Sequence, residues 1–137
     1  MNKLTPALMV EDVNKTTEYY KNVLGFQFIM GLPEKSQEVL TEITKDKQLI
    51  FALMKRGNVE FMFQEKKSLG EDVPPLKGKE IGGSFTLYIE TEGVKEFYEE
   101  IKNKVVIVKD LHTAWYGMRE FYIKDCNGYI LTFAEKA

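Results

Sequence analysis

The chain of 137 residues contains one cysteine, one histidine and one tryptophan. A single cysteine excludes an intrachain disulfide. Cys126 lies in the turn Asp125-Cys126-Asn127-Gly128, and no histidine stands beside it to activate the thiol. We therefore interpret Cys126 as a bystander thiol and not as a nucleophile.

The charge balance and the lack of long apolar runs exclude two classes of partner. Lys and Arg number 19 against 21 Asp and Glu, which gives a net charge of −2, so the basic field that attracts nucleic-acid backbones is missing. No apolar run approaches the roughly 20 residues of a membrane-spanning helix, and the first residues do not resemble a signal peptide. We expect a cytoplasmic protein that binds neither nucleic acid nor membranes.

The sequence does contain material for a core, since 44% of the residues are hydrophobic and 12% are aromatic. We expect one domain over residues 1–137. Asp12 is a candidate N-cap for a helix that Gly25 ends. A second helix is expected over 93–103. Alternating or apolar segments predict strands at 4–10, 26–30, 38–44, 48–54, 58–64, 84–90, 105–111, 118–124 and 129–135.

The two halves of the chain repeat one pattern. Residues 7–29 match 86–108 in length and apolar rhythm, and residues 52–66 match 121–136. We interpret 1–65 and 83–137 as a duplicated β-α-β-β-β unit joined by a linker at 66–82. The alternative is an α+β domain whose halves agree by chance. The fold class is α+β in either case.

Two such sheets, curled side by side, predict a half-open barrel with a helix behind each sheet. Period-two alternation then assigns the faces. The predicted helix-facing residues are Leu8, Val10, Phe61, Phe63, Phe85, Leu87, Ile89, Phe121, Ile123, Leu131 and Phe133. The predicted concave-facing residues are Thr5, Ala7, Met9, Glu60, Met62, Gln64, Ser84, Thr86, Tyr88, Met118, Glu120, Tyr122, Ile130, Thr132 and Ala134. The repeat adds Phe51 and Leu53 to the concave set.

Two segments, "LTPALMVEDVNKTTEYYKNVLGF" at 4–26 and "GMREFYIKDCNGYILTFAE" at 117–135, resemble the vicinal oxygen chelate superfamily. That group includes glyoxalase I, extradiol dioxygenases, fosfomycin-resistance enzymes and bleomycin-resistance proteins. Cys126 replaces the proline that this hairpin usually has. The resemblance implies the duplicated fold described above and a homodimer, in which the halves pair within one chain or by domain swapping.

The resemblance also implies where a metal would be bound. Its enzymes hold a divalent cation at positions that correspond to Thr5, Met62, Ser84 and Thr132. Catalytic metals of this kind need imidazole or carboxylate donors, and hydroxyl and thioether groups are poor substitutes. The sequence therefore predicts no metal, no cofactor and no catalytic residues.

What remains is an aromatic and apolar surface with a few polar groups, which is typical of a small-molecule pocket. Methionines adapt to irregular ligands, and aromatic faces with carboxylates suit flat or cationic molecules. We predict metal-independent binding of such a molecule, an antibiotic or toxic metabolite, as in the bleomycin-resistance type. The predicted ligand-binding residues are Phe51, Glu60, Met62, Tyr88, His112, Trp115, Met118, Glu120, Tyr122 and Thr132.

Two other functions stay open at this point. One is a divalent-metal lyase, isomerase or dioxygenase with the atypical ligands Glu60, Glu120 and His112. The other is a structural or regulatory dimer whose cavity is vestigial, with its methionines and tyrosines serving as core or interface. In that case Trp115 only packs a loop and His112 is an ordinary loop residue. Arg119 is a weak further candidate for binding an anion.

Overall fold

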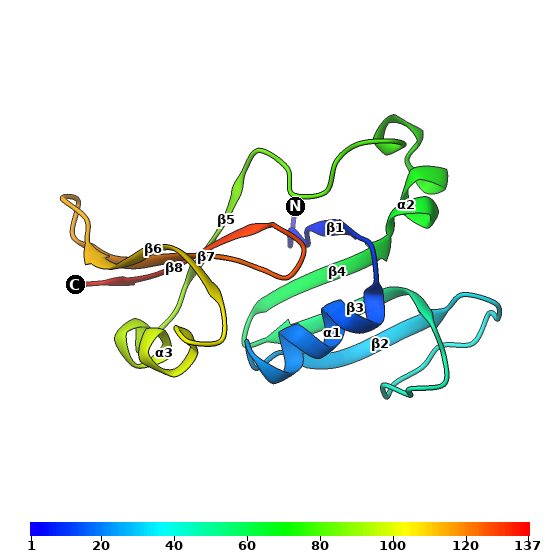
Figure 1. Ribbon diagram of the computed structural model, residues 1–137, viewed down its shortest axis with the longest axis horizontal. Coiled ribbons are helices and arrows are strands. Elements are labelled where there is room, and N and C mark those ends of the chain that lie inside the picture. Colours follow the sequence, from blue (N-terminus) through cyan, green and yellow to red (C-terminus); the bar gives the residue numbers. More distant parts are fainter. The chain divides into compact units, whose positions relative to one another are not determined.

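The computed structural model describes residues 1–137, which form two compact units, Met1–Glu80 and Ile81–Ala137. Each unit contains one four-stranded mixed sheet with a helix against it (Figure 1). The order strand, helix and three strands occurs once in each unit. The predicted α+β class and the duplicated β-α-β-β-β pattern are confirmed.

The first unit has the strand order β1-β4-β3-β2, in which β1 runs parallel to β4 and the other pairs are antiparallel. Helix α1 packs against β3 and β4. Its elements are β1 (Ala7–Val10), α1 (Val13–Asn22), β2 (Gln27–Pro33), β3 (Leu49–Arg56), β4 (Val59–Glu65), α2 (Lys66–Asp72) and the short η1 (Pro74–Leu76).

The second unit repeats this topology with the strand order β5-β8-β7-β6 and a parallel β5–β8 pair. Helix α3 packs against β7 and β8, which leaves the other face of the sheet without a helix from this unit. Its elements are β5 (Thr86–Glu90), α3 (Val94–Ile101), β6 (Val106–Thr113), β7 (Met118–Lys124) and β8 (Ile130–Lys136).

The two repeated helices begin differently. At α1, the Asp12 carboxylate accepts the Lys15 N–H at 3.1 Å. At α3 the cap residue is Gly93, at φ 69°, which has no side chain to offer. Instead Glu135 of β8 accepts the N–H groups of Gly93 and Val94, both at 3.0 Å. These two bonds lower the pKa of Glu135 and fasten the start of α3 to the sheet.

The core of each unit lies between its helix and its sheet, as alternation predicts. In the first unit Tyr20 of α1 packs on Phe61 and Phe63 of β4. In the second unit Phe97 of α3 packs on Phe121 and Phe133. Ala52 and Met54 are fully buried, whereas Phe51 and Leu53 lie opposite Gln64 and Met62, on the face away from α1. This face was the one predicted for Phe51 and Leu53.

Three local predictions are wrong. Residues 38–44 form no strand; only Leu40 pairs, through an isolated bridge to Gly31. None of these seven side chains is buried and most are exposed, so a strand here would have nothing to pack against. The segment 66–82, predicted as an irregular linker, contains α2 and η1. Phe85 does not enter the core: it precedes β5, is half exposed and stacks on Tyr129 at 6.0 Å between centroids.

The alignment of the two repeats also needs a correction. Met62 of β4 lies opposite Ala7, whereas Thr132 of β8, its counterpart, lies opposite Tyr88. Ala7 therefore corresponds to Tyr88 and not to Thr86. The cap residues Asp12 and Gly93 each follow five positions later. A shift of two residues keeps every side chain on the same face of its strand, so this correction does not change the faces assigned to the strand residues.

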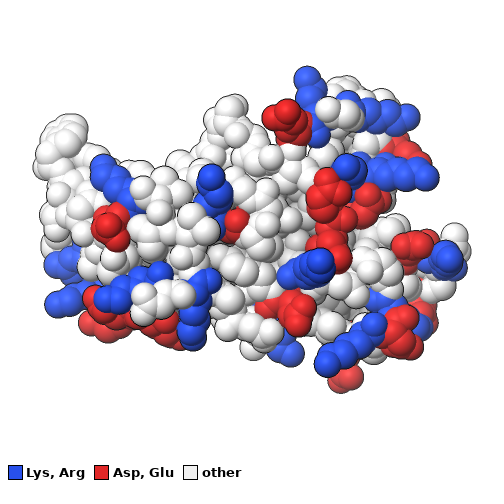
Figure 2. All heavy atoms as spheres, viewed as in Figure 1, with Lys and Arg blue, Asp and Glu red and all other residues white.

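Acidic and basic side chains are interspersed on the face drawn in Figure 2. None of the helices has both the length and the apolar character that crossing a bilayer requires.

We predict that Phe121→Ala lowers the free energy of unfolding by about 3–5 kcal/mol. Phe121 is fully buried and contacts the rings of Phe97, Tyr98 and Phe133. Urea denaturation followed by circular dichroism measures the loss. Phe85→Ala is the matched control and should cost much less, since that ring is half exposed. Equal losses would contradict this assignment of the core.

Candidate functional site

The candidate site is centred on a buried carboxylate of β7. Phe121 points to α3, so its neighbour Glu120 projects from the opposite face of the sheet. The side chain of Glu120 is 0% exposed. A buried charge is costly unless hydrogen bonds satisfy it, and the surroundings of Glu120 supply these bonds.

Three tyrosine hydroxyls donate to Glu120. Tyr88 donates to Oε2 at 2.7 Å and Tyr122 to Oε1 at 3.3 Å. The Tyr116 hydroxyl is shared between Oε1 at 2.7 Å and Oε2 at 2.8 Å. His112 Nε2 lies 3.6 Å from Oε1. We call these five residues the Glu120 cluster.

Sheet register brings the Glu120 cluster together. His112 of β6 lies directly opposite Glu120. Tyr122 follows Glu120 by two positions on β7, and Tyr88 of β5 reaches across β8. Tyr116 comes from the short turn between β6 and β7. Four of the five residues belong to the predicted site, and all five lie in the second unit.

The cluster holds Glu120 in its charged form. Burial acts to raise the pKa of Glu120, but the hydrogen bonds from Tyr116, Tyr88 and Tyr122, together with His112, bring the pKa below its ordinary value. The same hydrogen bonds, with burial, raise the pKa of Tyr88 and of Tyr116 to about 12. At neutral pH the cluster is therefore one carboxylate held by neutral phenols.

The outer side of the cluster is aromatic and accessible. Tyr88 is 48% exposed and Tyr116 is 50% exposed. Trp115 is 95% exposed and lies edge-on to Tyr116 at 5.5 Å between centroids. Lys109 places its Nζ 5.6 Å from the centre of the Tyr122 ring. A ligand can therefore approach aromatic rings while the carboxylate stays covered.

Sequence reasoning misplaced one member of the cluster and missed another. His112 was predicted in a loop, but it lies in β6, directly opposite Glu120. Tyr116 is absent from the predicted ligand-binding residues. Its place in the tight turn before β7, four residues before an inward-facing glutamate, was the available signal.

The other predicted residues lie apart from these contacts. Thr132 is buried, and its hydroxyl is 2.7 Å from the hydroxyl of Thr86. Met118 is half-buried at the start of β7, opposite Lys136. The remaining three predicted residues, Phe51, Glu60 and Met62, belong to the first unit.

A protein-family comparison identifies the fold. The model of the Glyoxalase/Bleomycin resistance protein/Dioxygenase superfamily matches residues 4–133. The chain belongs to this superfamily. The superfamily contains both small-molecule binders and metal-dependent enzymes, so membership alone does not choose between binding and catalysis. No curated protein matches the chain.

Solved structures agree with this fold at low sequence identity. A protein of unknown function from Agrobacterium tumefaciens has a TM-score of 0.74 at 23% identity, covering 100% of this chain and 95% of its own. TioX from Micromonospora has a TM-score of 0.72 at 16% identity, covering 100% of both chains. A superfamily member from Sphaerobacter thermophilus has a TM-score of 0.70 at 18% identity, covering 99% and 98%.

The residues at the superfamily's metal positions do not fit a metal. Thr5 and Ser84 precede β1 and β5, and the corrected repeat alignment makes Thr86 the counterpart of Thr5. These three residues offer only hydroxyls, and Met62 offers only a thioether. The Thr132 hydroxyl is engaged by Thr86. No group of three or more His, Cys, Asp or Glu side chains gathers in ligating arrangement.

The atypical ligand set is engaged elsewhere as well. The Glu60 carboxylate accepts from Lys3 Nζ at 2.6 Å, an ion pair that lowers the pKa of Glu60. The Glu120 carboxylate is surrounded by phenols. Both carboxylates would have to give up these partners to ligate a cation.

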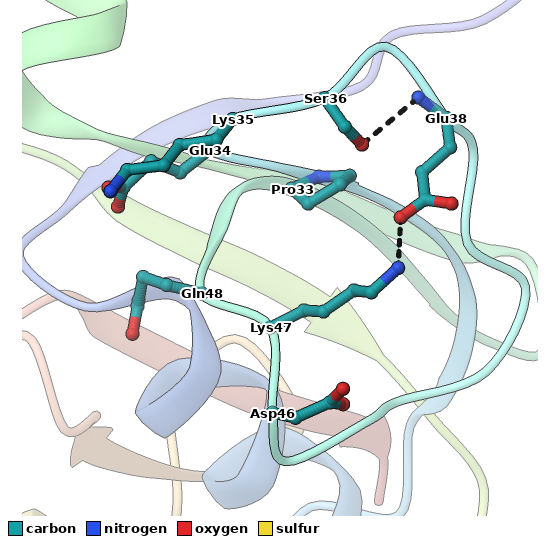
Figure 3. Close-up of a pocket in the computed structure, with 8 residues that line it drawn as sticks. All are labelled: Pro33, Glu34, Lys35, Ser36, Glu38, Asp46, Lys47 and Gln48. Carbon is teal, nitrogen blue, oxygen red and sulfur yellow. Dashed lines mark hydrogen bonds and ion pairs between the residues drawn. The ribbon is translucent and has the colours of Figure 1, made fainter.

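A separate hollow of about 370 Å³ lies in the first unit, on the connection from β2 to β3. Figure 3 shows Glu38 and Lys47 pointing toward each other there, with an ion pair between them, and the Glu38 N–H donating to Ser36 Oγ. Its eight lining residues are mostly charged, and only Pro33 is apolar.

We predict that Glu120→Gln shifts the ionisation of Tyr88 and Tyr116 from about pH 12 back toward the ordinary tyrosine range. Without the carboxylate, the phenols lose their strongest reason to stay protonated. Alkaline titration of tyrosinate absorbance measures the shift, with circular dichroism as a check on folding. Tyr98, whose pKa is raised by Asp110, should not respond. An unchanged titration curve would contradict the cluster.

Proposed function

We propose that this protein binds a small aromatic or cationic organic molecule without a metal, on the face of the second sheet that α3 leaves free. The Glu120 cluster and Trp115 form the central contact surface, and Met118 and Thr132 belong to the same face. An antibiotic or toxic metabolite is the proposed class of ligand, and tolerance to it is the proposed role.

One observation carries this proposal: an ionised, fully buried carboxylate lies behind half-exposed tyrosine rings. The phenols screen Glu120 from water but leave its negative charge acting through a medium of low dielectric. Aromatic faces with negative charge behind them attract flat or cationic molecules. Few other ligands would gain from this combination.

The composition of the metal positions supports binding over metal-dependent catalysis. Catalytic metals in this superfamily's geometry require donors such as imidazole or carboxylate. Thr5, Met62, Ser84 and Thr132 offer none. Calorimetry with a panel of planar cationic and glycopeptide compounds tests binding. Stoichiometric metal in protein purified without chelator, combined with turnover, would favour the enzyme instead.

We predict that Trp115→Ala weakens binding of the best compound from this panel about threefold or more, because the cation loses an aromatic face. The denaturation midpoint should barely change, since Trp115 is almost fully exposed. Calorimetry and urea denaturation on the same variant separate the two effects. If affinity falls only in proportion to the folded fraction, Trp115 is a packing residue.

We also propose that the chain forms a homodimer. β6 is an edge strand, and its residues Val106 and Val108 are exposed. Unpaired edges with apolar side chains favour pairing with another strand. Light scattering should give twice the chain mass of 15.9 kDa, and Val108→Lys should reduce that mass. A wild-type mass that stays at one chain across the concentration range would refute the dimer.

A further inference from the structure

We propose that the Glu120 cluster selects an organic cation that carries no N–H donors, such as a quaternary ammonium group, over a primary ammonium of similar size. This inference rests on the proposed binding function and narrows its ligand class. It follows from how the hydrogen-bonding capacity of the cluster is already used.

The Glu120 carboxylate already has its own donors. A carboxylate accepts about four hydrogen bonds, and three tyrosine hydroxyls donate to Glu120 at 2.7 to 3.3 Å, the Tyr116 hydrogen being shared between the two oxygens. His112 approaches Oε1 at 3.6 Å. The side chain has no exposed surface. The negative charge is therefore present, while both oxygens accept hydrogen bonds from the protein and lie out of a ligand's reach.

A primary and a quaternary ammonium differ in what they require of this surface. A primary ammonium carries three N–H donors. On binding, each donor that loses its water molecule needs an acceptor on the protein. The phenolic oxygens of the cluster are modest acceptors and can satisfy only part of this need. Donors that stay unsatisfied are costly. A quaternary ammonium has no donors to satisfy and is held by charge and by aromatic faces.

The protein already places a cation of its own, the Lys109 ammonium, over the Tyr122 ring. Lys109 Nζ lies 5.6 Å from the centre of the Tyr122 ring. The face of Tyr122 is thus occupied, whereas Tyr88, Tyr116 and Trp115 keep about half or more of their surface exposed. The cation of a ligand would bind at these three rings and would be repelled by Lys109.

The test uses three probes of nearly the same shape: benzyltrimethylammonium, the primary ammonium α,α-dimethylphenethylammonium and the neutral neopentylbenzene. Their binding is followed by the fluorescence of Trp115, the single tryptophan of the chain. We expect benzyltrimethylammonium to bind roughly tenfold more tightly than either of the others. In Glu120→Gln this preference over neopentylbenzene should disappear, while neopentylbenzene binding is unchanged.

A surface variant keeps the test valid if Glu120→Gln does not fold. Lys109→Met removes the competing positive charge and should tighten benzyltrimethylammonium binding about two- to fivefold. Its matched control is Lys95→Met, because Lys95 is exposed on α3, behind the opposite face of the sheet. The control should leave the affinity unchanged. An equal effect of both variants would show a general charge effect and overturn the inference.

The outcomes separate this inference from the proposed function. Equal binding of all three probes, or tighter binding of α,α-dimethylphenethylammonium, would overturn the selectivity and leave the binding function standing. Failure of all three probes to bind would overturn the selectivity, and it would count against the binding function only if the wider compound panel also fails. A quaternary preference that Glu120→Gln abolishes supports both.

Discussion

The face of the second sheet that α3 leaves free is organised around one buried carboxylate. Glu120 has no exposed surface, and burial of a carboxylate is unfavourable unless donors replace water. Here the donors are hydroxyls of Tyr88 on β5, Tyr122 on β7 and Tyr116 in the turn between β6 and β7. The need to satisfy one side chain therefore fixes the geometry of two strands and a turn. The same phenols form the surface on which the proposed ligand would lie.

Strand alternation lets the core and the cluster occupy the same strand. Phe121 packs under α3 while Glu120, one residue earlier, faces the tyrosines. Thr132 and Phe133 divide β8 in the same way. A slip of one residue would place the carboxylate in the apolar core. The aromatic core thus enforces the register on which the cluster depends.

The same alternation explains which residues of the site could be predicted from the sequence. Tyr88, Glu120 and Tyr122 lie in regular strands, so period two placed them on one face correctly. β6 has two register shifts, one between Ile107 and Lys109 and one between Lys109 and His112, and period-two alternation does not follow such bulges. His112 was expected in a loop because the predicted strand 105–111 ends one residue before it. Tyr116 acts from a turn, where no periodicity applies.

The cluster also explains how this chain can place a negative charge on the sheet face without creating a metal-binding site. A free carboxylate on the sheet face would attract divalent cations, and the superfamily's enzymes depend on such donors. In this chain Thr86 and Thr132 bond to each other, and the carboxylate on the neighbouring strand is covered by neutral phenols. Covering Glu120 removes its lone pairs but not its charge. Attraction of a diffuse organic cation survives that covering, whereas ligation of a small metal ion does not, because it requires direct contact with the oxygens.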